Sequence, residues 1–222
     1  MSHVSVKPLL VIVGSGPGVS SGITSKFGGN GFRIVLVARN AASLESRVKE
    51  LHEQHIEAYG VPADASDSNS LKTAFSHIQS VYGTVDVLVY NAANIVPGDP
   101  LSLTERQLID DFKVNTVGAL TSAQQVIPEM IERKQGTLFF TGGTLALKPN
   151  PKYASLSVGK AALHSLAQSL TATLSPHGIY VGQVLIGGYV QKGSFYDPER
   201  IADIFWDLYT TQSQTEVVFE ES

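Results

Sequence analysis

The residues whose type and spacing first indicate a functional site are three glycines that directly follow an apolar segment. Leu9–Val13 is an unbroken apolar run with β-branched residues, which is typical of a strand buried on both faces of a parallel sheet. Gly14, Gly16 and Gly18 follow at once, and an amphipathic helical pattern begins near Val19. Such a turn brings backbone N–H groups and a helix N-terminus up to a phosphate, because glycine has no side chain to hold the phosphate away. The motif predicts a phosphate-binding loop.

The spacing of this loop departs from the common dinucleotide fingerprint GxGxxG. Val19 occupies the position of the third glycine, so the glycines by themselves also fit a simple turn between a strand and a helix. The elements that follow in the chain decide between these two interpretations.

The rest of the chain alternates predicted strands and helices. The further strands are expected at Phe32–Ala38, Ile56–Val61, Val85–Tyr90, Thr137–Thr141, Ile179–Ile186 and Thr215–Phe219. After the helix that starts near Val19, helices are expected from Asn40 to about Gln54, from Ser66 or Asp67 past Ile78, from Thr104 to Glu132 with a possible kink at Pro128, from Lys152 to Ser175, and from Pro198 to Thr210. This pattern predicts an α/β fold with a doubly wound parallel sheet.

Right-handed crossovers place the carboxyl ends of all parallel strands at one edge, where ligands of such sheets bind. Polar residues and glycines gather at these predicted strand ends: Gly14–Gly18, Arg39, Asp64, Asn91, Thr141 and Ile186–Gly188. The alternation of elements therefore favours a ligand site that includes the glycine loop.

Composition restricts the class of protein. The chain has 222 residues, 43% hydrophobic residues and a net charge of −4, which fits one globular domain over residues 1–222 and gives no basic surface for nucleic acid. There is no cysteine, and the six histidines share no metal-ligand spacing, so no metal site is expected. No apolar run reaches the length of a membrane span, and no signal-peptide pattern is present, so we expect a soluble cytoplasmic protein.

With these residues placed, the chain resembles the short-chain dehydrogenase/reductase family over nearly its whole length. The matching segments are VGSGPGVSSG, VDVLVYNAA, VNTVG and KYASLSVGKAALHSLAQSL. The resemblance implies a seven-stranded Rossmann fold, a nicotinamide cofactor, and hydride transfer to or from a carbonyl or an activated double bond of a small-molecule substrate. It also implies a homodimer or homotetramer that pairs through the helices at Thr104–Glu132 and Lys152–Ser175.

Several positions depart from the main pattern of this family, and two of them are catalytic positions. Leu156 stands where the catalytic tyrosine of YxxxK is expected, and Gly143 stands where the catalytic serine is expected. The enoyl-reductase branch of the family instead uses Tyr-x6-Lys, which matches Tyr153 and Lys160. This resemblance implies that Tyr153 is the general acid and that Lys160 binds the nicotinamide ribose and lowers the phenol pKa. Asn115 is implied in a proton relay.

The resemblance also implies a set of cofactor contacts. They are Gly14, Gly16, Gly18, Val19, Ser20, Asp64, Ala65, Asn91, Ala92, Lys160 and Gly187. Arg39 follows the second strand, where an acidic residue would favour NAD by accepting a hydrogen bond from the ribose 2′-hydroxyl. Because a guanidinium instead fits a 2′-phosphate, we expect NADP, with NAD as the alternative.

Two functions remain open at this point. Tyr153 and Lys160 favour an NADP-dependent oxidoreductase, whereas Gly143 and Leu156 favour a protein that binds the cofactor without chemistry and acts as a sensor or partner subunit. The segment at about 188–197, where this family usually folds a substrate lid, is short and predicts an open site.

Overall fold

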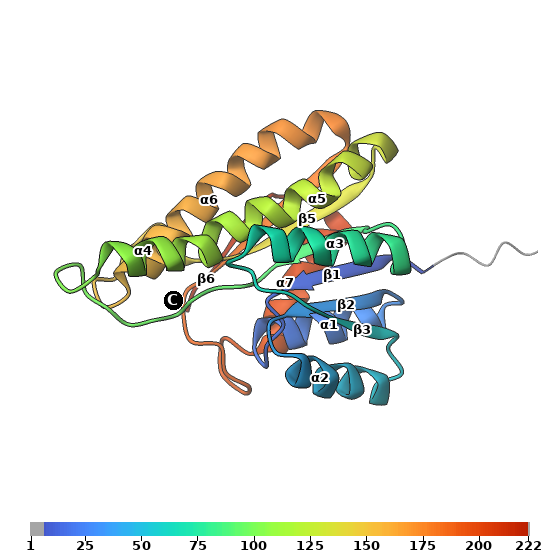
Figure 1. Ribbon diagram of the computed structural model, residues 1–222, viewed down its shortest axis with the longest axis horizontal. Helices are drawn as coiled ribbons and strands as arrows, with labels where there is room; N and C mark the ends of the chain where they lie inside the picture. The colour runs from blue at the N-terminus through green and yellow to red at the C-terminus, as the bar shows by residue number, and fades with distance from the viewer. Residues whose placement is uncertain (1–6, 222) are drawn as a thin grey trace, which may run out of the picture.

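The segment Leu9–Val13 forms strand β1, one of the inner strands of a seven-stranded sheet in the computed structural model, which describes residues 7–221 (Figure 1). The other strands are β2 (Arg33–Ala38), β3 (Ala58–Pro62), β4 (Val87–Tyr90), β5 (Gly136–Gly143), β6 (Ile179–Ile186) and β7 (Glu216–Phe219). The order is β3-β2-β1-β4-β5-β6-β7, and every neighbouring pair is parallel. The predicted doubly wound parallel sheet is confirmed. Its strand order reverses between β1 and β4, which is where such sheets bind ligands.

Helices cover both faces of the sheet. Figure 1 shows α3 (Ser68–Tyr82), α5 (Gly118–Arg133) and α6 (Ala154–Leu174) above it, and α1 (Val19–Gly29), α2 (Ala41–Glu53) and α7 (Pro198–Thr211) below. Alternate residues of β1 enter the two cores, Leu9 and Val11 on the side of α3 and α5, Leu10 and Ile12 on the side of α1 and α7. Because both faces are buried, the strand is apolar throughout.

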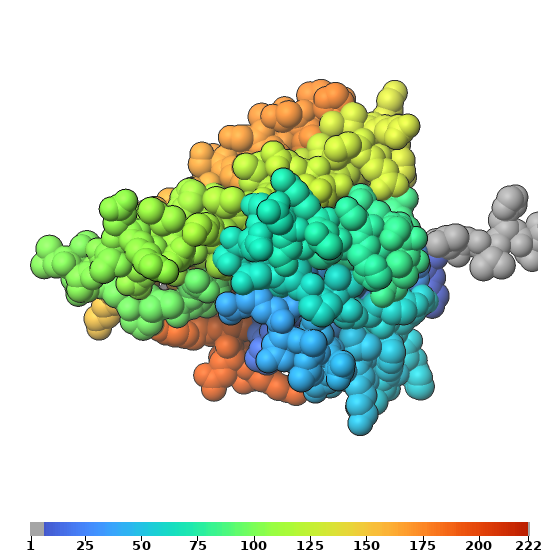
Figure 2. Space-filling view, viewed as in Figure 1, coloured from blue at the N-terminus to red at the C-terminus, as the bar shows by residue number. Residues whose placement is uncertain are grey.

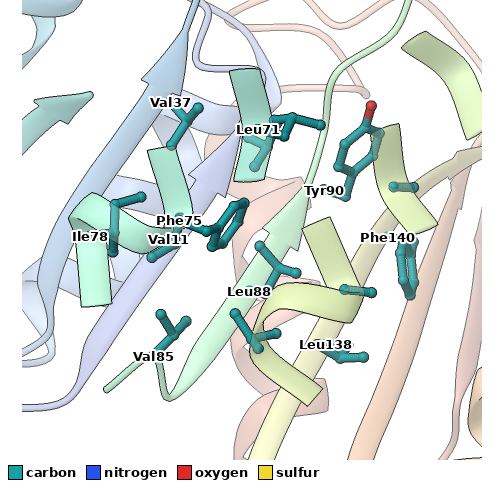
Figure 3. Close-up of a cluster of buried hydrophobic side chains, with 14 of the residues drawn as sticks. Val11, Val37, Leu71, Phe75, Ile78, Val85, Leu88, Tyr90, Leu138 and Phe140 are labelled. Atoms are coloured by element: carbon teal, nitrogen blue, oxygen red, sulfur yellow. The ribbon is translucent and has the colours of Figure 1, made fainter. Parts of the chain in front are cut away.

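Tyr90 lies at the end of the core on the side of α3 and α5, next to the carboxyl edge of the sheet. Figure 3 shows its ring packed beside apolar side chains such as Phe140, with the hydroxyl pointing away from the cluster. This hydroxyl donates a hydrogen bond to the backbone carbonyl of Val114. Burial raises the pKa of the Tyr90 phenol, so the group stays a protonated donor.

The long helix expected over Thr104–Glu132 is interrupted. It consists of α4 (Glu105–Phe112), a π-helical turn (Lys113–Val117) and α5. The Tyr90 hydroxyl binds a carbonyl inside the π turn, and Gly118 leaves room for that hydroxyl, since a Cβ there would lie 2.3 Å from it. The π turn changes the direction of the side chains that follow it, and such turns are frequent at functional sites.

Candidate active site

A cleft of about 760 Å³ opens at the carboxyl edge of the strands. All the residues predicted to bind a cofactor line it, and so does Tyr153. Asn115 does not line the cleft and is buried behind it. Figure 2 shows the segment around residues 95–112 (green) and the segment around residues 188–197 (orange), which flank the opening, projecting on the same side of the molecule. The topology thus brings together residues that are far apart in the chain.

The glycine loop begins with a residue that must be glycine. Gly14 has a φ of +93°, and a Cβ there would lie 2.3 Å from the backbone nitrogen of Ala92. The side-chain amide of Asn91 donates to the Gly14 carbonyl at 2.8 Å. The start of the loop is therefore held against the end of β4, across the point where the strand order reverses.

The next part of the loop presents backbone amides to the cleft. Within residues 7–221, the N–H groups of Gly18, Val19 and Ser20 have no hydrogen-bond partner. They lie at the N-terminus of α1, where the helix dipole favours an anion. A diphosphate fits this set of donors, although the third glycine of the common fingerprint is absent.

The side chain of Ser20, a residue predicted to contact the cofactor, makes its hydrogen bonds within the glycine loop. Its hydroxyl accepts a hydrogen bond from the Gly16 N–H and donates to the Gly16 carbonyl, both at 2.7 Å. The side chain is buried and closes the loop from within. It fixes the loop conformation, and only its backbone N–H is left for a ligand.

Two charged side chains lie at the end of the cleft near β2 and β3. Arg39 is exposed and forms no ion pair within the described part of the chain. One carboxylate oxygen of Asp64 accepts hydrogen bonds from the N–H and hydroxyl of Ser66, both at 2.8 Å. Although burial acts in the opposite direction, these bonds and the nearby charge of Arg39 hold the pKa of Asp64 below its usual value. Asp64 thus presents a carboxylate, and Arg39 a guanidinium that is available for an anion.

Lys160 is buried on α6 and points into the floor of the cleft. Its ammonium group donates to the backbone carbonyl of Thr141 at 2.6 Å. Burial lowers the pKa of Lys160 to about 8. A buried lysine without a carboxylate partner costs stability, and groups perturbed in this way are frequent at functional sites.

Tyr153 lies at the N-cap position of α6, just before the helix begins, and lines the mouth of the cleft. Its hydroxyl shares a hydrogen bond with the hydroxyl of Tyr189, and this bond, together with burial, raises the pKa of Tyr153. Among the described residues, no hydrogen bond joins Tyr153 to Lys160. The prediction that Lys160 lowers the phenol pKa is wrong, because the pKa of Tyr153 is raised by Tyr189 and burial, and Lys160 makes no bond to the phenol.

Asn115 sits in the π turn and braces the wall of the cleft. Its side-chain oxygen accepts a hydrogen bond from the backbone N–H of Asn94 at 2.8 Å, and Asn94 in turn donates to the buried carboxylate of Asp111 at 3.2 Å. The Asn115 side chain packs on Gly159, where a Cβ would lie 2.6 Å from its own. Its Nδ2 has no partner in the described residues and is therefore free to take part in a relay.

The two positions that depart from the family pattern both lie in the cleft. A Cβ on Gly143 would meet Lys160 and Ile186 only at ordinary contact distances of 3.6–3.8 Å, so there is space for a side chain there. Leu156 is buried and apolar. Neither residue supplies a proton, and the hydroxyl of the nearby Thr141 is buried without a partner among the described residues.

The segment between β6 and α7 borders the cleft on the other side. The N–H of Gly187 donates to the Phe219 carbonyl at 2.9 Å, so it is not available to a cofactor. Phe195 stacks on Phe219 with ring centres 4.8 Å apart, and the Arg200 guanidinium lies 4.4 Å above the Phe195 ring. The segment is therefore anchored to β7.

Sequence reasoning missed Tyr189, Asn94 and Asp111. Tyr189 belongs to a segment without regular pattern, and its proximity to Tyr153 follows only from the way the loop is anchored. Asp111 belongs to an amphipathic helical pattern, where a carboxylate is ordinarily exposed.

The chain matches the family model described as short chain dehydrogenase over residues 8–192 and belongs to this family. It is 30% identical over 180 residues to an uncharacterized oxidoreductase of Thermotoga maritima, covering 80% of this chain and 69% of that protein. It is 29% identical over 177 residues to a very-long-chain 3-oxoacyl-CoA reductase of Aspergillus fumigatus, covering 77% of this chain and 50% of the relative. The chain thus spans only about half the length of some of the relatives that it matches.

Solved structures share the fold. A metagenomic short-chain oxidoreductase in complex with NADP superposes with a TM-score of 0.88 at 26% identity, covering 97% of both chains. An actinorhodin polyketide ketoreductase with NADPH superposes with a TM-score of 0.88 at 21% identity, covering 96% of this chain and 95% of that one.

Within residues 7–221, no helix combines the length and apolar character needed to cross a bilayer. No group of three acidic or histidine side chains in that range is arranged to hold a metal ion.

Proposed function

We propose that the protein is an NADP(H)-dependent oxidoreductase that reduces a carbonyl or enoyl group, with Tyr153 as the general acid. The proposal rests on one observation, which is that three features line the same cleft: the free amides at the N-terminus of α1, the buried Lys160 and the hydroxyl of Tyr153. The amides support a diphosphate, and the exposed guanidinium of Arg39 supports a 2′-phosphate. The reduced nicotinamide would supply the hydride.

In this proposal the residues of the chain bind and move a proton. As a carbonyl carbon gains a hydride, its oxygen gains the phenolic proton of Tyr153, so the product is an alcohol and the phenol is left as a phenolate. The raised pKa of Tyr153 keeps the phenol protonated at neutral pH, which is the form that a reduction needs. Lys160, in the floor of the cleft, is available to the ribose hydroxyls. Asn115 packs on Gly159, the residue that precedes Lys160 on α6.

The test is turnover by Tyr153→Phe. NADPH oxidation is followed with a panel of aldehydes, ketones and enoyl thioesters, and each active substrate is repeated with the variant. Loss of a general acid is expected to lower kcat by about 10²–10⁴-fold while NADPH affinity is unchanged. Tyr82→Phe, which removes a hydroxyl outside the cleft, is the control. Turnover that survives in Tyr153→Phe removes the tyrosine from the mechanism.

A protein that binds the cofactor without chemistry is the second candidate. It is favoured by the bonds that occupy the two key side chains, Tyr153 with Tyr189 and Lys160 with Thr141, and by the absence of a proton donor at Gly143 and Leu156. Tight NADPH binding with no turnover on any substrate of the panel would support this candidate.

A further inference from the structure

The half of the cleft near β4, β5 and β6 contains several large apolar side chains beside the polar Asn94, Thr144 and Asn150. The apolar ones follow the carboxyl ends of these strands or come from α6: Ile95, Leu145, Leu156 and Tyr189. Arg39 and Asp64 lie at the opposite end, after β2 and β3. Because the strand order separates the two groups, a cofactor bound by the glycine loop leaves the apolar half for the substrate.

Apart from Lys160, which the proposed function assigns to the cofactor ribose, no charged side chain lines this apolar half. Among the residues lining the cleft, Arg39, Asp64 and Lys160 are the charged ones. Lys160 is buried, and its ammonium group is bound to the Thr141 carbonyl. A substrate carboxylate or phosphate placed here would lose water without gaining a free cation, which disfavours binding.

Large apolar side chains also extend from the cleft to its rim. Ile95 is 64% exposed and Tyr189 is 73% exposed, although both line the cleft. Exposed apolar side chains that are grouped around an opening are typical of a surface that binds a ligand or partner. Because they continue into the buried Leu156, the occupant reaches from the rim into the cleft, as a small molecule does and a flat protein surface does not.

The wall that carries Ile95 is preformed. The Gly98 N–H donates to the Lys152 carbonyl at 2.9 Å, and the Ala154 N–H donates to the Gly98 carbonyl at 3.1 Å. These bonds tie the segment after β4 to the start of α6. The apolar surface therefore keeps its shape without a ligand, which favours binding because little order has to be gained.

We propose that the substrate is an uncharged, mainly apolar aldehyde or ketone whose hydrocarbon part lies between Ile95, Leu156 and Tyr189. The proposal rests on the proposed function, since the carbonyl must reach the catalytic groups. It goes further by excluding substrates that carry an anionic group on the hydrocarbon part.

The first experiment uses unbranched aldehydes of four to ten carbons together with their ω-carboxylate counterparts. Each added methylene is expected to raise kcat/KM about threefold to fourfold until the apolar half is filled, in line with the transfer free energy of one methylene. Each ω-carboxylate is expected to have a kcat/KM at least about tenfold lower than the aldehyde of the same length, because its charge is unpaired. Equal or higher values for the carboxylates would overturn the proposal while leaving the oxidoreductase function intact.

The second experiment measures binding without turnover. Affinity for 1-decanol is determined by calorimetry with the NADP-loaded protein, for the wild type, Ile95→Asp and Leu101→Asp. Ile95→Asp is expected to weaken decanol binding at least about tenfold. Leu101→Asp, on the same segment but outside the cleft and 99% exposed, is expected to leave it unchanged.

The outcomes separate this inference from the proposed function. Decanol binding that depends on Ile95, without turnover of any aldehyde, would support the apolar site and count against the enzyme. Turnover with equal decanol affinity in all three proteins would count against the apolar site alone.

Discussion

The hydroxyl groups of Tyr153 and Tyr189, 36 residues apart in the chain, share a hydrogen bond at the mouth of the cleft. One tyrosine lies at the start of α6 and the other follows β6, so the bond joins two sides of the opening. This bond is the first cause of the raised pKa of Tyr153. The contact with Tyr189 therefore holds the pKa of the residue that we propose as the acid above its usual value.

Tyr189→Phe is expected to change the pH dependence of the reverse reaction. Alcohol oxidation needs the phenolate of Tyr153 as a base, and the variant removes the bond that raises the pKa of this phenol. The lower pKa means that the phenolate forms at lower pH, so the rising limb of kcat against pH moves to lower pH. Rates of NADP reduction measured between about pH 6 and pH 10 test this expectation.

Tyr196→Phe serves as the control for that profile. Tyr196 belongs to the same segment, but its hydroxyl binds the N–H of Glu221 and lies outside the cleft lining. A profile that is the same in Tyr189→Phe, Tyr196→Phe and the wild type would exclude the influence of Tyr189 on catalysis.

Arg39→Ala is expected to weaken NADPH binding by about 1–3 kcal/mol and to leave NADH binding nearly unchanged. The reason is the charge-assisted hydrogen bonding of a guanidinium to a 2′-phosphate, which NADH lacks. Fluorescence titration of both cofactors measures the effect. Arg106→Ala, at an exposed arginine outside the cleft, is the matched control. An equal loss for both cofactors would refute this role of Arg39.

The fold was predictable because its signals are local. Burial on both faces makes strands such as Leu9–Val13 apolar throughout, and the predicted caps Asn40 and Asp67 both accept hydrogen bonds from the first turn of their helices. The π turn at Lys113–Val117 was not predictable, because it depends on the Tyr90 hydroxyl, which reaches it from a distant strand.

The candidate site was predictable only in part. The ends of parallel strands meet at one edge by topology, so the residues proposed for the cofactor gather in one cleft. Which partner an individual group binds, and so whether it is free for a cofactor, depends on contacts between residues that are not adjacent in the sequence. The Ser20 hydroxyl binds Gly16, the Gly187 N–H binds Phe219, and neither contact has a signal in the sequence.

The assembly of the protein gives a further prediction. Large apolar side chains are exposed on three neighbouring helices, Ile109 of α4 at 48%, Leu120 of α5 at 37% and Val158 of α6 at 47%. We expect these helices to pair between copies in a homodimer or homotetramer, since burial of apolar surface drives association. Light scattering at micromolar concentration is expected to show an oligomer for the wild type.

Leu120→Asp tests the surface on which that assembly depends. A charge in an apolar interface is expected to shift the mass toward the monomer. Val81→Asp, at an apolar side chain of α3 that is 57% exposed, is expected to keep the wild-type mass. A monomeric wild type, or equal masses for both variants, would contradict pairing through these helices.

The last prediction concerns the cost of keeping Lys160 charged inside the fold. Burial lowers its pKa to about 8 in the folded protein, against about 10.4 for an unfolded lysine. Between these values the unfolded chain binds more protons than the folded one, so folding stability rises with pH, whereas below about pH 8 the full penalty is present. Lys160→Met lacks this pH-dependent contribution to the free energy of unfolding.

The free energy of unfolding of the wild type, relative to that of Lys160→Met, is therefore expected to increase by about 2 kcal/mol from about pH 7 to about pH 9.5. Urea unfolding of both proteins at these two pH values measures this difference, and Lys72→Met, at an exposed lysine of α3, controls for general effects of pH. A difference between the wild type and Lys160→Met that stays constant with pH would show that Lys160 keeps an ordinary pKa and is hydrated in the folded protein.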